Sequence, residues 1–109
     1  MATTYKVLGQ SNPSATTATT LYTVPSATQA VVSTIVVANL TTTAATFRIA
    51  VRVAGATLAN SQYVAYDITV GASDSTTITL GLTLGATDVI TVYASTANLT
   101  FSAFGSEIS

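Results

Sequence analysis

Apolar and polar residues alternate in short runs along most of the chain, and no stretch shows the three-to-four-residue period of an amphipathic helix. The clearest case is the segment 46–53, where Phe47, Ile49, Val51 and Val53 point to one side. The residues that point to the other side are Thr46, Arg48, Ala50 and Arg52. A period of two is that of a β-strand with one buried face.

Eight runs of this kind are rich in β-branched and aromatic residues and are separated by Gly, Pro, Asn, Asp and Ser. The predicted strands span residues 3–8, 20–25, 29–38, 46–53, 62–70, 76–84, 89–94 and 99–104. The sixth run places its apolar residues on one face, and its glycines predict a bulge or a bend. Those apolar residues are Ile78, Leu80, Leu82 and Leu84.

Strands at a spacing of about 8–12 residues predict an all-β protein. We expect an antiparallel sandwich of about eight strands, with either a jelly-roll or an immunoglobulin-like topology. The length of 109 residues suits one domain. We divide it into an N-terminal strand and extended arm in residues 1–20, the sandwich in residues 21–105 and a tail in residues 106–109.

The composition excludes several classes of protein. There is no Cys, His or Trp, whereas Thr and Ser together make up 34 of the 109 residues. A disulfide scaffold and a zinc site of Cys and His are therefore excluded. We expect no metal ion and no cofactor.

Charged residues make up only 6% of the chain, and the net charge is −1. They are Lys6, Arg48, Arg52, Asp67, Asp74, Asp88 and Glu107. Three cations are too few for a nucleic-acid groove or for adsorption to an anionic membrane. No basic and apolar leader opens the sequence, so we expect no secretion signal. Low net charge promotes association, which predicts a homo-oligomer, with a trimer favoured over a monomer coated with hydroxyl groups.

The carboxylates are the only residues suited to acid–base catalysis, because His is absent. Asp74 and Asp88 follow glycine-containing turns, where an Asp side chain commonly caps the turn. A Ser or Thr nucleophile would lack a base. We therefore predict that the protein is not an enzyme.

Five residues are candidates for contact with a partner: Tyr22, Arg48, Arg52, Tyr63 and Tyr66. Arg48 and Arg52 share one strand face, and they suit either a carboxylate on a neighbouring subunit or a solubilising, edge-protecting role. Tyr63 and Tyr66 are three residues apart, which in a regular strand places one in the core and one on the surface. The exposed one, near Asn60 and Gln62, is compatible with a glycan site.

Several strings occur together in order along residues 21–105. They are Leu21-Tyr-Thr-Val-Pro25, Val32-Ser-Thr-Ile-Val-Val-Ala-Asn39, Phe47-Arg-Ile-Ala-Val-Arg52, Tyr66-Asp67, Leu84-Gly-Ala-Thr-Asp88 and Phe104-Gly105. This pattern resembles small Thr/Ala/Val-rich virion structural proteins of tailed bacteriophages. The resemblance carries no motif of functional residues.

The resemblance implies a head decoration (cement) protein, made in the host cytoplasm and held in the virion by the major capsid protein or other virion proteins. The alternative is a β-sandwich module of a tail fibre or baseplate that binds a host glycan or receptor. A third hypothesis is a hydrolase that uses the carboxylates Asp67, Asp74, Asp88 and Glu107.

Overall fold

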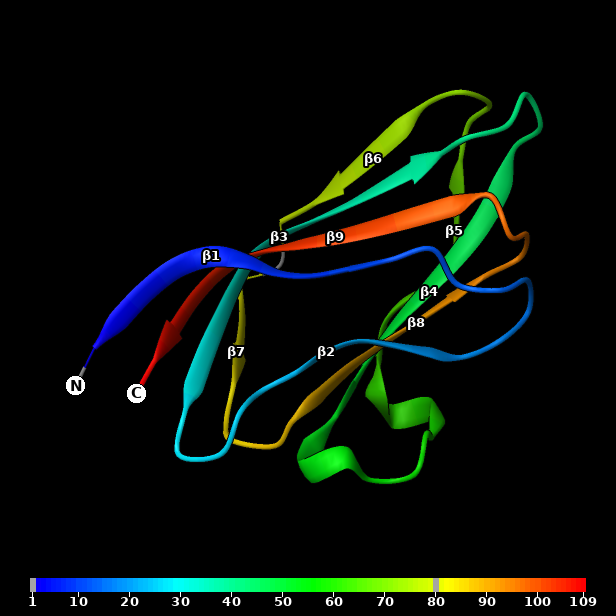
Figure 1. Ribbon diagram of the computed structural model, residues 1–109. Coiled ribbons are helices and arrows are strands. Elements are labelled where there is room, and N and C mark those ends of the chain that lie inside the picture. The colour runs from blue at the N-terminus through cyan, green and yellow to red at the C-terminus, as the bar shows by residue number, and fades with distance from the viewer. Residues whose placement is uncertain (1, 80) are drawn as a thin grey trace.

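The computed structural model describes residues 2–79 and 81–109, which form two packed antiparallel β-sheets (Figure 1). The strands of the described residues are β1 (Thr3–Ser11), β2 (Thr19–Thr23), β3 (Gln29–Asn39), β4 (Ala45–Arg52), β5 (Tyr63–Val70), β6 (Ser75–Ile78), β7 (Leu82–Leu84), β8 (Val89–Ala94) and β9 (Leu99–Ile108). Two short 3-10 helices, η1 (Val53–Gly55) and η2 (Asn60–Gln62), lie between β4 and β5. The prediction of an all-β antiparallel sandwich is confirmed.

The strand order is that of a jelly roll. One sheet has the order β1-β9-β3-β6, with β7 also beside β3, and the other has the order β2-β8-β4-β5. Because β6 and β7 pair with successive parts of β3, they act as one interrupted strand. The first strand then pairs with the last, the second with the second-last, and so on inward to β4 and β5. Such a rolled-up hairpin is a jelly roll, whereas an immunoglobulin-like sandwich pairs its first two strands.

The last strands differ from their predicted bounds. The sixth predicted strand is split into β6 and β7, and Gly81 between them has a φ of +61°, which confirms the expected bend. Leu80, predicted to face the core there, lies outside the described residues. The predicted tail is wrong, because β9 continues to Ile108 and pairs with both β1 and β3. Hydrogen bonding on two sides outweighs the weak strand preference of Gly105-Ser-Glu107.

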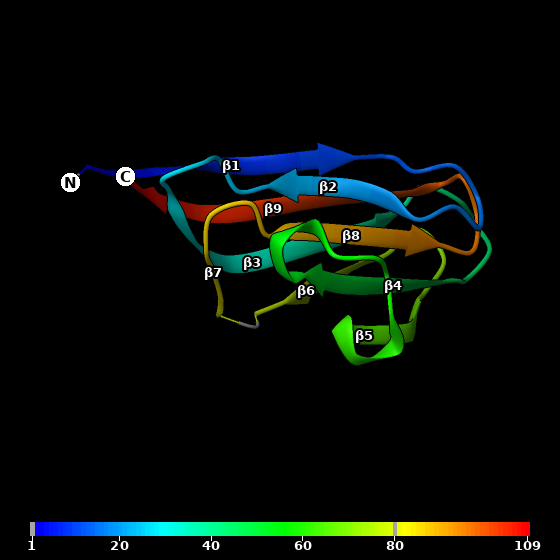
Figure 2. The same ribbon diagram turned by 90° about the horizontal axis from the view of Figure 1, so that it is seen from below.

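The N-terminal region is also part of the sandwich. β1 pairs with β9, and Ala2 and Ser109 exchange backbone hydrogen bonds of 2.8 and 2.9 Å, so both ends of the chain lie side by side (Figure 2). The segment between β1 and β2 is held by the side-chain amide of Asn12, which donates to the carbonyls of Ala97 and Leu99. The predicted boundaries at residues 20 and 105 therefore do not separate an arm and a tail from the domain.

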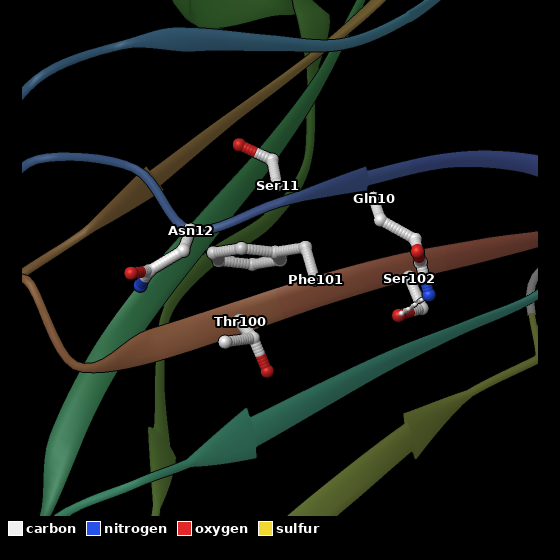
Figure 3. A pocket seen from close by; sticks show the side chains of 6 residues that line it. All are labelled: Gln10, Ser11, Asn12, Thr100, Phe101 and Ser102. Carbon is white, nitrogen blue, oxygen red and sulfur yellow. Dashed lines mark hydrogen bonds between the residues drawn. The ribbon is translucent and has the colours of Figure 1, made fainter.

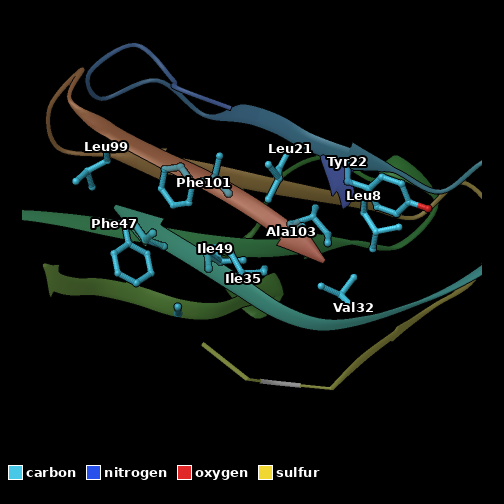
Figure 4. Close-up of a cluster of buried hydrophobic side chains, with 14 of the residues drawn as sticks. Leu8, Leu21, Tyr22, Val32, Ile35, Phe47, Ile49, Leu99, Phe101 and Ala103 are labelled. Carbon is cyan, nitrogen blue, oxygen red and sulfur yellow. The ribbon is translucent and has the colours of Figure 1, made fainter. Parts of the chain in front are cut away.

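The core lies between the two sheets (Figure 4). Its largest fully buried side chains are Phe47, Phe101, Ile35, Ile49, Ile90, Leu99, Val24, Val32, Val37, Val70 and Val92. Phe47 of β4 and Phe101 of β9 meet edge to face across the sheets, with ring centroids 6.0 Å apart. The alternation predicted for β4 holds for Phe47 and Ile49, but Val53 lies in η1 and is exposed.

One glycine is required where β9 crosses a bulge of β3. The pairing of these strands shifts between Val32 and Thr34, and this brings the Val31 carbonyl oxygen against Gly105. A Cβ atom at position 105 would clash with that oxygen. Only glycine fits this approach of two backbones.

Candidate interaction surface

Two of the candidate catalytic carboxylates bind backbone N–H groups at or next to turns. Asp88 accepts hydrogen bonds from the backbone N–H of Gly85 at 2.9 Å and of Ala54 at 2.8 Å. Asp74 accepts from the backbone N–H of Ser75 at 2.8 Å. The predicted turn-capping role is confirmed for Asp88, whereas Asp74 binds the first residue of β6, just after its turn.

Asn39 fixes one end of the sandwich, a role that the sequence does not reveal. Its side-chain amide donates to the carbonyls of Thr43 and Gly71 at 2.9 and 3.2 Å, and its oxygen accepts from the backbone N–H and the hydroxyl of Thr41, each at 3.0 Å. The side chain therefore ties the β3–β4 loop to the β5–β6 loop. Among the described residues, no group of three His, Cys, Asp or Glu is placed to hold a metal ion.

Tyr22 lies inside the protein and is not a surface contact residue. Only 7% of it is exposed, and its hydroxyl donates to Glu107 Oε2 at 2.5 Å, while Lys6 Nζ donates to Glu107 Oε1 at 3.3 Å. The hydrogen bond from Tyr22, assisted by Lys6, lowers the pKa of Glu107 below its usual value. Burial and the neighbouring carboxylate raise the pKa of Tyr22 above its usual range. The prediction of Tyr22 as a partner contact is therefore wrong.

Arg52 acts within its own chain. Its Nε donates to the Ala56 carbonyl at 2.7 Å and its Nη2 to the Gly55 carbonyl at 2.9 Å. These carbonyls belong to the sharp turn around η1, where Ala54 has a φ of +53°. The guanidinium therefore holds this turn through the two carbonyls.

Arg48 is the centre of an aromatic group on the outer face of the second sheet. Its Cζ lies 4.2 Å from the ring centroid of Tyr66 and 4.4 Å from that of Tyr93. Its Nε donates to Asp67 Oδ1 at 2.7 Å, which raises the pKa of Arg48 further above its usual range. Tyr63 packs edge to face on Tyr66, with centroids 5.0 Å apart. We call these five residues the Arg48 cluster.

A β-bulge in β5 assembles this cluster. Tyr93 of β8 lies directly opposite Arg48 in the strand register. On the other side of β4, Phe47 pairs with Ile68 and Ile49 with Ala65, so that both Tyr66 and Asp67 lie opposite Arg48. Asp67 takes up the extra residue with a left-handed φ of +51°. A second register shift of β5, opposite Ile49 and Ala50, leaves Val64 as an extra residue between the two tyrosines. The prediction that Tyr63 and Tyr66 lie on opposite faces is therefore wrong, because this shift breaks the period of two.

The Arg48 cluster is ordered and yet open to solvent. Tyr66 is 55% exposed, and the side chains of Asp67 and Arg48 are 46% and 24% exposed. Tyr and Arg are enriched in interface hot spots. Side chains that are already fixed before binding contribute more to affinity, because less conformational entropy is lost when the complex forms. The cluster therefore has the chemistry of a protein-contact site.

A second candidate surface is a shallow depression of about 370 Å³ between the ends of β1 and β9 (Figure 3). Its lining residues are Gln10, Ser11, Asn12, Thr100, Phe101 and Ser102. The amide of Asn12 is used by backbone carbonyls, and the ring of Phe101 is buried in the core. The depression therefore offers hydroxyl groups but no aromatic ring for a sugar to stack on.

The structure is a jelly-roll β-sandwich that carries the Arg48 cluster on the outer face of one sheet. Comparisons of the chain with protein-family models, curated proteins and solved structures find no match. Among the described residues, no helix has the length and apolar character needed to span a membrane. The function must therefore be argued from the surface itself.

Proposed function

We propose that this protein is a structural component of a tailed-phage virion, a head decoration (cement) protein. In this proposal the Arg48 cluster docks onto the major capsid protein or another virion protein and thereby reinforces the head. The observation that carries the proposal is the arrangement of Tyr66 and Arg48, a solvent-exposed ring stacked on a guanidinium that its own chain already fixes.

The distribution of charge supports this role. All seven ionisable side chains of the acidic and basic residues have a partner within the chain: Lys6 with Glu107, Arg48 with Asp67, Arg52 with loop carbonyls, and Asp74 and Asp88 with turn N–H groups. Docking of this surface then does not strip water from unpaired charges, which would be costly. The resemblance to phage virion proteins and the occurrence of jelly rolls in viral capsids agree with this role.

Add-back to particles tests the proposal. We expect phage heads that lack this protein to release their DNA at a lower temperature, and we expect the purified wild-type protein to restore the higher temperature. Tyr66→Ala removes the exposed ring and should bind the heads at least about tenfold more weakly. Leu40→Ala is the control, because Leu40 is also exposed but lies in the β3–β4 loop.

Two outcomes would contradict the proposal. Heads that lack the protein and keep their full thermal stability would argue against a cementing role. If Tyr66→Ala bound heads as tightly as Leu40→Ala, the contact would not involve the Arg48 cluster.

The alternative function is a tail-fibre or baseplate module that binds a host glycan or receptor. The exposed ring of Tyr66 favours it, and jelly rolls also occur in lectins. However, Arg48 covers one face of that ring and binds both oxygens of Asp67, which leaves fewer groups for a sugar. A glycan array decides the matter: hits that Tyr66→Ala abolishes would establish this function, and an array without hits would remove it.

A further inference from the structure

The two sheets of the sandwich have four edges, which differ in the length of regular strand that they offer. β5 contains two register shifts and the left-handed Asp67, the β6/β7 edge is broken at Gly81, and β2 has five residues and a register shift. β1 has nine residues and one register shift, between Val7 and Gly9, and it pairs regularly with β9 from Thr3 to Val7. Proteins protect long, regular edges, because unpaired backbone groups bind other strands. Within the described part of the chain, β1 therefore offers the longest regular edge segment, Thr3–Val7, which carries one charged residue, Lys6.

The backbone groups that β1 offers follow from its pairing with β9. Ala2 and Ser109 form a pair that exchanges two backbone hydrogen bonds. Along an antiparallel ladder, such pairs alternate with pairs whose backbone groups point away from each other. Thr3, Tyr5 and Val7 therefore direct their N–H and C=O groups to the free edge, which forms one margin of the sandwich in Figure 2. The side chains of Tyr5 and Val7 are 84% and 47% exposed, so the chain itself does not cover this strip.

We propose that this edge binds a second copy of the protein, with β1 antiparallel to β1 and Tyr5 opposite Tyr5 on a twofold axis. The geometry is self-complementary, because Thr3 and Val7 are each two residues from Tyr5. Thr3 of one copy therefore lies opposite Val7 of the other copy. The three outward residues of one copy thus meet those of the other and exchange backbone hydrogen bonds. The central tyrosines form a cross-strand aromatic pair.

The charges of the edge are compatible with this pairing. Lys6 of one copy lies opposite the uncharged Thr4 of the other, and Thr4 is itself paired with Glu107 on β9. Lys6 of each copy therefore lies two strands away from Glu107 of the other copy, and no two residues of like charge lie opposite each other. The net charge of −1 on each copy adds little repulsion.

The proposed symmetry bears on the oligomeric state. A twofold contact closes in a dimer, whereas the trimer expected from the sequence needs β1 to bind a different edge. The other edges offer shorter regular segments than Thr3–Val7, so the dimer is the assembly that this edge favours. The site is separate from the Arg48 cluster, and the inference does not depend on the proposed function.

Substitutions that place a charge at Tyr5 test whether Tyr5 lies on the twofold axis of a dimer. Tyr5→Lys and Tyr5→Glu each place like charges opposite one another in a homodimer and should raise its Kd at least about tenfold. An equimolar mixture of the two variants should recover the dimer. Sedimentation equilibrium measures both, and Leu40→Lys, at another exposed apolar residue, should behave like the wild type. A wild-type protein that stays monomeric, or a mixture that does not recover, would overturn the proposal.

A disulfide tests the register, because the chain contains no cysteine. Directly opposed residues of a hydrogen-bonded pair have Cα atoms about 5.5 Å apart, which is within the range of a disulfide. Tyr5→Cys should therefore form an intermolecular disulfide under mild oxidation, with an unchanged Tm. Val53→Cys is the control, since Val53 is exposed in η1. Cross-linking of Tyr5→Cys that is no faster than that of Val53→Cys would overturn the pairing.

Discussion

β1 and β5 are both edge strands, yet they expose different chemistry. β5 is broken by bulges, and its extra residue brings Tyr66 and Asp67 together around Arg48. β1 is regular up to Val7, and Tyr5 projects from it almost fully exposed. A bulge thus organises side chains into a contact surface while it spoils the edge for strand pairing. A regular edge keeps its backbone available to another strand.

The largest expected effect is on the β1 side, at Gly105. Gly105→Ala forces a Cβ atom against the Val31 carbonyl, and we expect the free energy of unfolding to fall by at least about 2 kcal/mol. Gly71→Ala is the matched control after β5, because its Cβ would lie 3.7 Å from the flexible side chain of Asp74. Urea denaturation of both variants measures the difference. Equal stability of the two would contradict the close approach of β9 and β3.

A double-mutant cycle on the β5 side has an intermediate expected effect. Changing Tyr63 and Tyr66 to Ala, singly and together, should show a coupling of about 1 kcal/mol, because the rings pack edge to face. A regular strand would place them on opposite faces with no coupling. The cycle of Tyr5 and Tyr66 is the control and should be additive. Additivity of Tyr63 and Tyr66 would argue against the register shift that lies between them in β5.

The smallest expected effect concerns Glu107, beside β1. Its pKa is lowered in the folded protein, so its stabilising contribution is present above its ordinary value of 4.5 and is lost as the pH falls through the folded pKa. Glu107→Gln keeps an acceptor for Tyr22 but removes the charge. We expect the variant to be less stable than the wild type at pH 7, and the difference to shrink below pH 4.5. Thermal unfolding across pH measures this, and a constant difference would contradict it.

Much of the fold was predictable because the local pattern and the burial agree. The alternation around Phe47 and Ile49 identified β4, and the short runs placed most other strands within a few residues. Asp74 and Asp88 were assigned to turns from their neighbouring glycines alone. These features depend on residues close in sequence, whose preferences the pattern records directly.

The candidate site was predicted only in part. Arg48 was expected on the outer face of its strand, and one of Tyr63 and Tyr66, without saying which, was expected to be exposed. Tyr66 is exposed, but Tyr22 was wrongly expected to contact a partner, and Tyr63 was wrongly expected on the opposite face from Tyr66. Tyr22 is buried because Glu107, a distant residue in the chain, provides a partner for its hydroxyl. No local signal marks that pairing.

The sequence by itself determined that the chain is an all-β sandwich with a hydroxyl-rich surface and very few charges, because composition and the period of two suffice for that. Only the tertiary structure decided the jelly-roll order, the continuation of β9 to Ile108 and the position of every ion pair. The physical reason is that strand partners, bulges and cross-strand neighbours depend on residues far apart in the chain. Their energies are set by hydrogen bonding and packing between strands, which no local pattern encodes.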